Sequence, residues 1–237
     1  MSIFRRGTKD RVESPAEVAG NGAESADLGP LRTDGPLDVS EVSGLEGRLD
    51  LGALWLAPVA NLELRLEVDQ ATDTISGMQF VLGDSAAQVQ AFAAPRSGGL
   101  WAEIRAELSE AIATGGGTVE EAAGSFGAEL HAQMPQRAAD GRTVLAPARF
   151  VGIDGPRWFV RAVLSGRAAT DDEAAAPLFE AVRSLVVVRG SDPMAPRDLL
   201  PLKVPDGPAP QAPDDEDGPG QPDLNPFERG PELSEVR

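Results

Sequence analysis

The block Gly83-Asp84-Ser85 invites comparison with esterases, because some of them carry their nucleophile in a Gly-Asp-Ser block. A serine nucleophile needs a histidine that takes up its proton. The chain has a single histidine, His131, and no Asp-x-x-His element near the C-terminus. The Gly-x-Ser-x-Gly elbow of other serine hydrolases is absent as well. We therefore interpret the block as a turn between strands and predict no catalytic residue.

Metal and cofactor chemistry would have few side chains to use. Cysteine is absent, which excludes disulfides, thiolate nucleophiles, cysteine-ligated zinc and iron–sulfur clusters. His131 and the nearby carboxylate of Glu129 could supply two ligands, but a transition-metal site normally assembles several ligands in a fixed geometry. The sequence therefore predicts an ordinary histidine in a strand, no metal and no cofactor.

The block Pro95–Trp101 is the best candidate for ligand binding. It lies between a predicted strand and the start of a predicted helix, where backbone N–H groups can bind an anion. Such a site would combine this block with two arginines of a later strand, and its residues would be Arg96, Ser97, Gly98, Gly99, Trp101, Arg157 and Arg161. The alternative is a tight connection in which Trp101 packs into the core. Residues 115–117 are also glycines, but they follow a helix, so they cannot cradle a phosphate.

The charge of the chain restricts its partners. It carries 38 Asp and Glu against 21 Lys and Arg, a formal net charge of −17. Binding to nucleic acid needs clustered basic residues, so no direct contact with nucleic acid is expected. An acidic surface attracts basic partners or cations, although a solvated acidic surface without a specific ligand is the simpler interpretation.

Hydrophobic alternation predicts the strands. In residues 61–69, leucine and valine alternate strictly with charged side chains, which is typical of a half-exposed strand. Residues 74–82 and 86–93 flank the turn at 83–85 and are predicted to form a hairpin. Further strands are predicted over residues 49–56, 129–134, 149–153, 157–164 and 185–188.

Two helices complete the predicted fold. Leu100, Ile104, Leu108 and Ile112 recur every four residues, with Ser97 as the expected cap and glycines at the end. A second helix is predicted to start at residues 170–173, where acids would lie in its first turn. Strands and helices in this order predict an α+β fold, a mostly antiparallel sheet of about six to eight strands with two principal helices packed on it.

Composition divides the chain into three parts. Residues 1–36 are rich in polar and small residues, and residues 193–237 contain 11 of the 20 prolines. We predict a disordered arm over residues 1–36, a single domain over 37–205 with its core in 45–190, and a disordered Pro-rich acidic tail over 206–237. Residues 194–202 are expected to wrap back onto the domain.

Both ends carry candidate contacts. Phe4, Arg5 and Arg6 are candidate partner-binding residues, and residues 1–11 could at most give weak contact with an anionic membrane. A frayed terminus is the simpler alternative. The segment Asn225-Pro226-Phe227, together with Leu233, interrupts the acidic tail and offers the kind of apolar anchor that a partner groove could hold. No run of 18 apolar residues and no apolar segment behind the first arginines is present, so we predict neither a membrane span nor a secretory signal and expect a cytoplasmic protein.

Three separated blocks of the sequence resemble a known family. They read VLGDSAAQVQAFAAPRSGGLWAEIR (81–105), GPRWFVRAVLSGRAA (155–169) and VVVRGSDPMAPRDLLPL (186–202). Together they resemble an uncharacterised actinobacterial family with a domain of unknown function, over about residues 34–205. The resemblance brings no biochemical role or catalytic residue. At the level of fold, the chain is similar to PsbP-type sandwiches, which mostly serve as binding or accessory modules, and a fold alone does not establish a function.

Three functions stay open. The leading hypothesis is a non-enzymatic interaction or accessory protein whose domain and tails bind an unknown protein partner. The sequence does not predict the oligomeric state. The second is a small-molecule or anion-binding domain that uses residues 95–101 with Arg157 and Arg161. The third is an enzyme that works through carboxylates and arginines, which requires a pocket with converging carboxylates of perturbed pKa.

Overall fold

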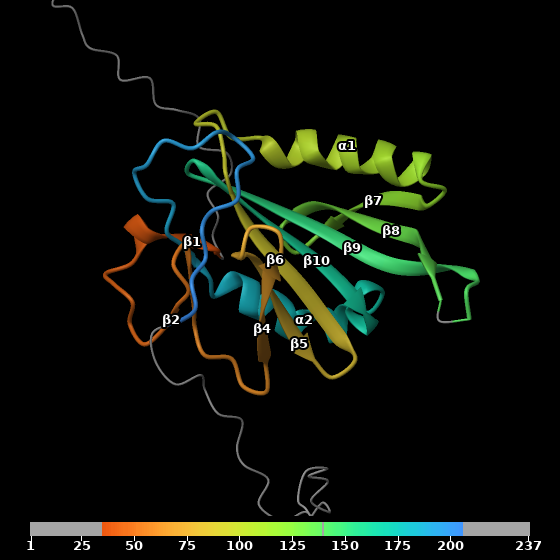
Figure 1. Ribbon diagram of the computed structural model, residues 1–237, viewed down its shortest axis with the longest axis horizontal. Coiled ribbons are helices and arrows are strands. Elements are labelled where there is room, and N and C mark those ends of the chain that lie inside the picture. Colours follow the sequence, from red (N-terminus) through yellow and green to blue (C-terminus); the bar gives the residue numbers. More distant parts are fainter. Residues whose placement is uncertain (1–34, 139, 206–237) are drawn as a thin grey trace, which may run out of the picture. The chain divides into compact units, whose positions relative to one another are not determined.

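The computed structural model describes residues 35–138 and 140–205 (Figure 1). Its helices are α1 (Leu100–Thr114) and α2 (Asp172–Arg183), with 3-10 turns η1 (Val39–Glu41) and η2 (Arg167–Ala169). Its strands are β1 (Leu37–Asp38), β2 (Leu49–Asp50), β3 (Leu54–Leu56), β4 (Glu63–Asp69), β5 (Thr74–Leu82), β6 (Ser85–Ala93), β7 (Thr118–Gly124), β8 (Gly127–Arg137), β9 (Thr143–Gly155), β10 (Trp158–Gly166) and β11 (Val186–Val187). None of the helices in these residues is long and apolar enough to cross a membrane.

The strands form two sheets. The larger sheet is antiparallel throughout, in the order β4-β5-β6-β10-β9-β8-β7. The smaller sheet has the order β1-β11-β3-β2, with β1 parallel to β11 and the other pairs antiparallel. The predicted α+β fold, with a mainly antiparallel sheet and two principal helices, is therefore confirmed.

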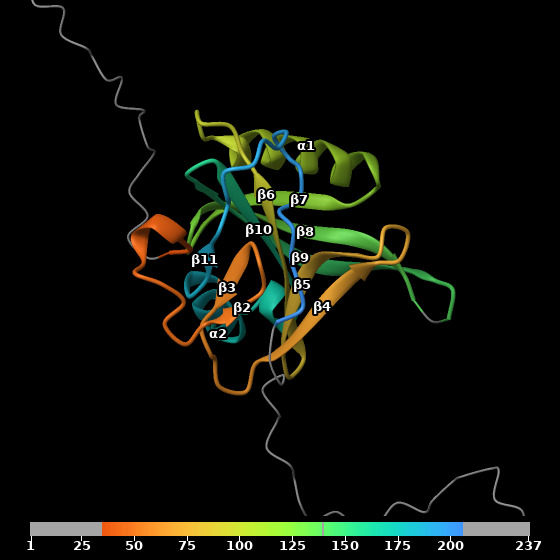
Figure 2. The same ribbon diagram turned by 60° about the vertical axis from the view of Figure 1, so that its left-hand side comes forward.

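The larger sheet lies between two layers, because its strands bury side chains on both faces. On β10, Trp158 and Val160 belong to the core shared with α2 and the smaller sheet. Phe159, which points the opposite way, packs with Trp101 of α1. Figures 1 and 2 show α1 along one face and α2 against the other. We refer below to the α1 face and the α2 face of the sheet.

Strand β7 is an element that sequence patterns did not predict. Its residues include the adjacent acids Glu120 and Glu121 among small residues, so its hydrophobic alternation is weak. It becomes a strand because residues 118–124 pair with residues 127–133 of β8 along their whole length. Strand formation at such a place depends on the partner strand more than on intrinsic propensity.

The two helices begin in different ways. Asp171 caps α2 as predicted, because its carboxylate accepts hydrogen bonds from the N–H groups of Glu173 (2.9 Å) and Ala174 (3.3 Å). The prediction that Ser97 caps α1 is wrong. The residue at the capping position is Gly99, which has a positive φ of 79° and no side chain that could accept a bond. Ser97 lies two residues earlier, at the surface.

Residues 197–203, here called the strap, continue alongside the sheet after β11. The N–H of Leu200 donates to the carbonyl of Ala91 (2.9 Å), and the N–H of Ala93 donates to the carbonyl of Asp198 (2.8 Å). The strap thereby takes the place of β5 beside the end of β6, because the pairing of β5 with β6 stops at Val89. The strap is the blue segment in Figure 2. It satisfies backbone groups of β6 that would otherwise lack partners.

Candidate functional site

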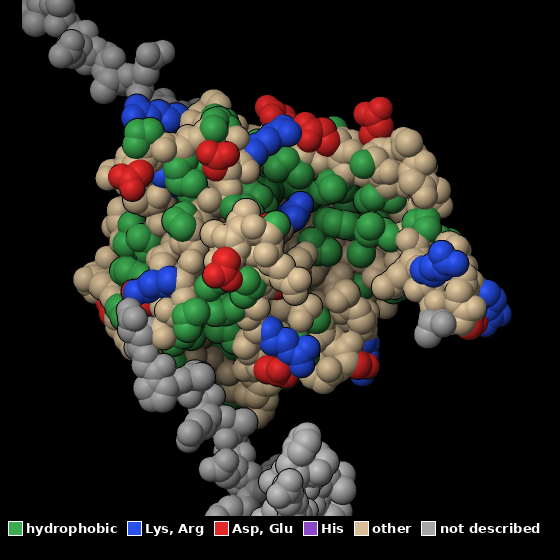
Figure 3. All heavy atoms as spheres, in the orientation of Figure 1, with side chains coloured by type: hydrophobic (Ala, Val, Ile, Leu, Met, Phe, Trp, Pro, Cys, Tyr) green, Lys and Arg blue, Asp and Glu red, His purple; other side chains and the backbone are tan. Residues whose placement is uncertain are grey.

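A hollow on the α1 face of the sheet, here called the α1 groove, has a volume of about 360 Å³. Its floor is formed by Phe92 of β6 and by Phe159 and Arg161 of β10. Its wall is formed by successive turns of α1, which contribute Ile104, Leu108 and Ala111. Figure 3 shows hydrophobic side chains gathered in a hollow below α1, with a basic side chain among them.

Arg161 is the charged group at the floor of the α1 groove. Its guanidinium lies 5.5 Å from the centre of the Phe92 ring and donates a hydrogen bond to the amide oxygen of Gln90. Its Nε is buried without a hydrogen-bond partner. Within residues 35–138 and 140–205, no carboxylate forms an ion pair with it. Burial lowers the pKa of Arg161, because the charged form loses hydration in these surroundings.

Arg197 of the strap closes the rim of the groove. Its guanidinium pairs with Glu107 at 2.8 Å and with Glu103 at 3.4 Å, so it links the strap to the outer surface of α1. The hydrogen bond to Glu107 and the charge of that carboxylate raise the pKa of Arg197. Its positive charge is therefore already matched, whereas that of Arg161 is not.

Trp101 belongs to the core below the start of α1. Its side chain is 5% exposed, its indole N–H donates to the carbonyl of Ala128 (2.6 Å), and its ring stacks on Phe159 with centroids 6.0 Å apart. A Cβ at Gly152 would lie 2.2 Å from the indole, so only glycine leaves room for this packing. The structure thus realises the alternative in which Trp101 packs into the core.

The start of α1 already has a negative group from the protein itself. Both carboxylate oxygens of Asp154, in β9, lie 3.3 Å from the backbone N of Trp101. A helix N-terminus attracts anions, and here the chain supplies its own. Burial raises the pKa of Asp154, the N–H groups of Trp101 and Leu100 oppose that shift, and the charge of Glu103 adds to it.

This raised pKa gives a pH-dependent prediction. The folded state binds the Asp154 proton more tightly than the unfolded state, so stability falls as pH rises from about 3.9, the ordinary aspartate pKa, through the raised value. In Asp154→Asn this titration is removed. Denaturant unfolding between about pH 3 and 7 should therefore show Asp154→Asn gaining stability relative to the unmodified protein as pH rises.

A second aspartate, Asp171, provides a control in which the change of stability with pH is expected to have the opposite sign. The hydrogen bond from Arg167 lowers the pKa of Asp171, so the stability that this group contributes is present at neutral pH and is lost as pH falls. Asp171→Asn should consequently lose stability relative to the unmodified protein as pH rises. If both variants kept a constant difference from the unmodified protein, neither assignment would hold.

The residues predicted for ligand binding are only partly brought together. Arg161 lines the α1 groove, and Trp101 lies beneath it in the core. The loop before α1 is separate from that groove: Arg96, Ser97 and Gly99 are exposed, and Gly98 has a φ of 66°. Arg157 is joined to this loop by its carbonyl, which accepts from the N–H of Ala94 (2.9 Å). Anion binding by this loop stays a prediction.

The residues predicted for partner binding lie outside the described part of the chain. These are Phe4, Arg5, Arg6, Asn225, Pro226 and Phe227. The partner and membrane contacts suggested for them stay predictions, as do the predicted disordered arm and tail.

Two observations concern the enzyme and metal alternatives, which stay hypotheses. Among them Asp154 is the one carboxyl group with a clearly raised pKa, and it caps α1 instead of converging with others in a hollow. The described ranges also contain no group of three or more His, Cys, Asp or Glu side chains that could hold a metal ion.

Sequence reasoning missed most of the groove. Sequence patterns predict Phe92 as part of a strand, Ile104 and Leu108 as part of a helix, and the segment of Arg197 as one that wraps back onto the domain. A signal was available on β10, where Arg161 falls between Phe159 and Val163 on the same face of the strand. An arginine in an otherwise apolar face indicates a buried or half-buried charge.

Comparison with known proteins places this domain in a family. No curated protein and no solved structure matches the chain. The family described as "Protein of unknown function (DUF3710)" matches residues 35–211, which includes all the described elements. The predicted membership of a family of unknown function is confirmed, while the actinobacterial origin and the similarity to PsbP-type sandwiches stay predictions. The chain therefore belongs to the DUF3710 family of proteins of unknown function.

Proposed function

We propose that this domain is a binding module whose α1 groove holds a small carboxylic acid with an apolar body. The observation that carries the proposal is Arg161, a half-buried guanidinium in an apolar hollow without a carboxylate partner among the described residues. A ligand carboxylate would supply the missing negative charge, and hydrogen bonds between charged groups contribute about 1.5–3 kcal/mol.

The shape of the groove supports this ligand class. Sites for small molecules have volumes of roughly 300–1,000 Å³, mostly apolar walls and a few polar groups. The α1 groove, at about 360 Å³, fits the lower end of that range. Phe92, Ile104, Leu108 and Phe159 would contact the apolar body, and Arg161 would fix the orientation of the acid. The proposal thus favours the second of the three hypotheses and moves its site from the loop to the groove.

The experiment is a binding titration with octanoate and with phenylpropionate, measured by calorimetry and by the shift of the thermal unfolding midpoint. Arg161→Met should weaken binding by about tenfold to a hundredfold, because it removes the charged hydrogen bond and keeps an apolar side chain. The domain of this variant should fold with undiminished stability, since the substitution removes a half-buried charge.

Two controls separate a specific site from general attraction. Arg65→Met removes an exposed arginine that is paired with Glu63, and it should leave the affinity unchanged. Octanol, which has the same apolar chain and no charge, should bind more weakly than octanoate. The proposal fails if neither acid binds saturably, or if Arg161→Met and Arg65→Met weaken binding equally.

A further inference from the structure

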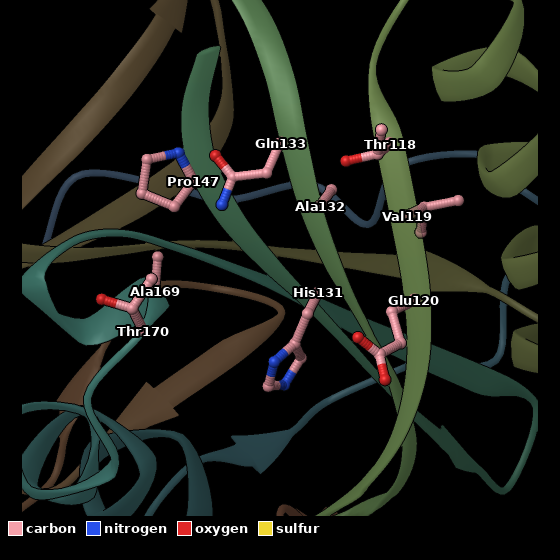
Figure 4. Close-up of a pocket in the computed structure, with 9 residues that line it drawn as sticks. All are labelled: Thr118, Val119, Glu120, His131, Ala132, Gln133, Pro147, Ala169 and Thr170. Carbon is pink, nitrogen blue, oxygen red and sulfur yellow. The ribbon is translucent and has the colours of Figure 1, made fainter.

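A second hollow, here called the His131 pocket, lies at the β7–β8–β9 end of the sheet. It has a volume of about 440 Å³. His131 points away from α1, because its neighbours Leu130 and Ala132 pack below that helix. Thr118 and Glu120 of β7, Gln133 of β8 and Thr170 after η2 complete the polar lining. Figure 4 shows the His131 ring between Glu120 and the segment with Thr170.

His131 is held by a buried pair of charges. Its Nε2 lies 2.7 Å from Oε1 of Glu129, and the same oxygen lies 2.7 Å from Nη2 of Arg149. Glu129 and Arg149 are 1% and 4% exposed. Arg149 also contacts Asp172 at 2.6 Å and lies over the ring of Phe179 at 4.9 Å. Strand register brings these groups together, since His131 lies opposite Arg149 on β9.

This arrangement decides which nitrogen of His131 faces the pocket as an acceptor. A carboxylate paired with arginine only accepts hydrogen bonds, so the proton of the neutral imidazole must lie on Nε2. The lone pair is then on Nδ1. A carboxylate fixes the tautomer and ring orientation of a histidine in this way in many metal sites, where the other nitrogen is the acceptor that is used. The side chain of His131 is 41% exposed, and it lines the pocket.

The other polar residues that line the pocket also favour a ligand that donates hydrogen bonds. Glu120 lies directly opposite His131 on the neighbouring strand, and in Figure 4 the two side chains extend to the same side. Thr118, Gln133 and Thr170 can each accept hydrogen bonds as well. No lysine or arginine is among the residues that line the pocket. A chain with a net charge of −17 adds a long-range attraction for cations.

We propose that the His131 pocket binds a small molecule through a primary ammonium group, which donates a hydrogen bond to Nδ1 of His131 on the edge of the ring that faces Thr170, while the negative charge of Glu120, beside the other edge of the ring, attracts it. The ammonium group fits because it carries three donors and a positive charge, and the pocket presents acceptors and a negative charge. The Glu129–Arg149 pair acts as the positioning element that keeps Nδ1 available.

The single histidine of the chain makes the test direct, because its ring gives one set of nitrogen NMR signals. At about pH 8 the unliganded full-length protein should show the Nε2–H tautomer. Addition of butylammonium should shift the Nδ1 signal saturably, and butanol, the uncharged analogue, should not. Glu120→Gln should weaken the affinity for butylammonium about tenfold or more, because it removes the opposing charge.

Glu121→Gln is the matched control. Glu121 is the next residue of β7, it points to the α1 face and it pairs with Arg105, so the same charge is removed outside the pocket. Its affinity should equal that of the unmodified protein. The proposal is overturned if butylammonium causes no saturable shift, if butanol shifts Nδ1 equally, or if both glutamate variants weaken binding alike. A response to zinc chloride alone, without a response to butylammonium, would also overturn it and assign the pocket to a metal ion.

Discussion

Replacing Arg149 by methionine is expected to lower the free energy of unfolding by about 3–5 kcal/mol. The substitution leaves the carboxylate of Glu129 without its charge partner in a place where it is 1% exposed. One oxygen of Glu129, Oε2, already lacks a hydrogen-bond partner, and Gly124 packs directly against this carboxylate. His131 alone would then remain to stabilise the buried charge.

The double variant Glu129→Leu/Arg149→Met should recover most of this loss. Replacing both members of a buried ion pair by apolar residues is often neutral or stabilising, because the cost of desolvating two charges disappears. Denaturant unfolding of the two single variants and the double variant gives the coupling free energy as a cycle. Arg142→Met is the control, since the Arg142–Asp140 pair is exposed and should contribute less than about 1 kcal/mol. A loss below that value for Arg149→Met would contradict the assignment of a dry, structural ion pair.

Replacing Trp101 by alanine is expected to cost about 3–5 kcal/mol as well, the usual range for removing a buried aromatic side chain. The indole fills the space above Gly152 and stacks on Phe159. Its loss also leaves the carbonyl of Ala128 without its hydrogen bond. Because Trp101 lies in the first turn of α1, the substitution should accelerate amide hydrogen exchange in α1 more than exchange in α2.

Trp55 provides the comparison for this variant. It is a tryptophan of the smaller sheet that is only half-buried, so Trp55→Ala should cost less than Trp101→Ala. The free energies of unfolding of both variants are measured by denaturant titration. The dependence on denaturant concentration, m, should be the same as in the unmodified protein. Equal costs would mean that Trp101 does not anchor α1, and the floor of the α1 groove would then need a different explanation.

Local patterns were sufficient for the elements whose residues interact with near neighbours. The hairpin of β5 and β6 follows from alternation on both sides of the turn at Gly83, which has a φ of 58°. Helix α1 follows from apolar residues every four positions, and α2 from Asp171 and the acids of its first turn. In each case the side chains that set the conformation lie within a few residues of the backbone that they affect.

Patterns failed where a distant segment made the decision. The cap of α1 comes from Asp154, 53 residues after Trp101, so no local rule could replace Ser97 as the expected cap. Strands β7 and β1 exist because a partner strand offers its backbone groups, and the partner of β1 is β11, which was predicted within residues 185–188. The sequence of β1 is too short, and that of β7 too weakly patterned, to predict a strand.

Composition excludes cysteine chemistry, and hydrophobic periodicity predicts the fold class, the main hairpin and both helices, because the pattern within each element reflects its own conformation. Which charged residues share a site depends on long-range contacts that local patterns do not contain. Register between β8 and β9 joins Glu129 and His131 to Arg149, and the packing of α1 across β10 turns Arg161 into the floor of a hollow. Arg149 lies 18 positions after His131, and Arg161 lies far from α1 in the chain, so strand register and helix packing set these distances.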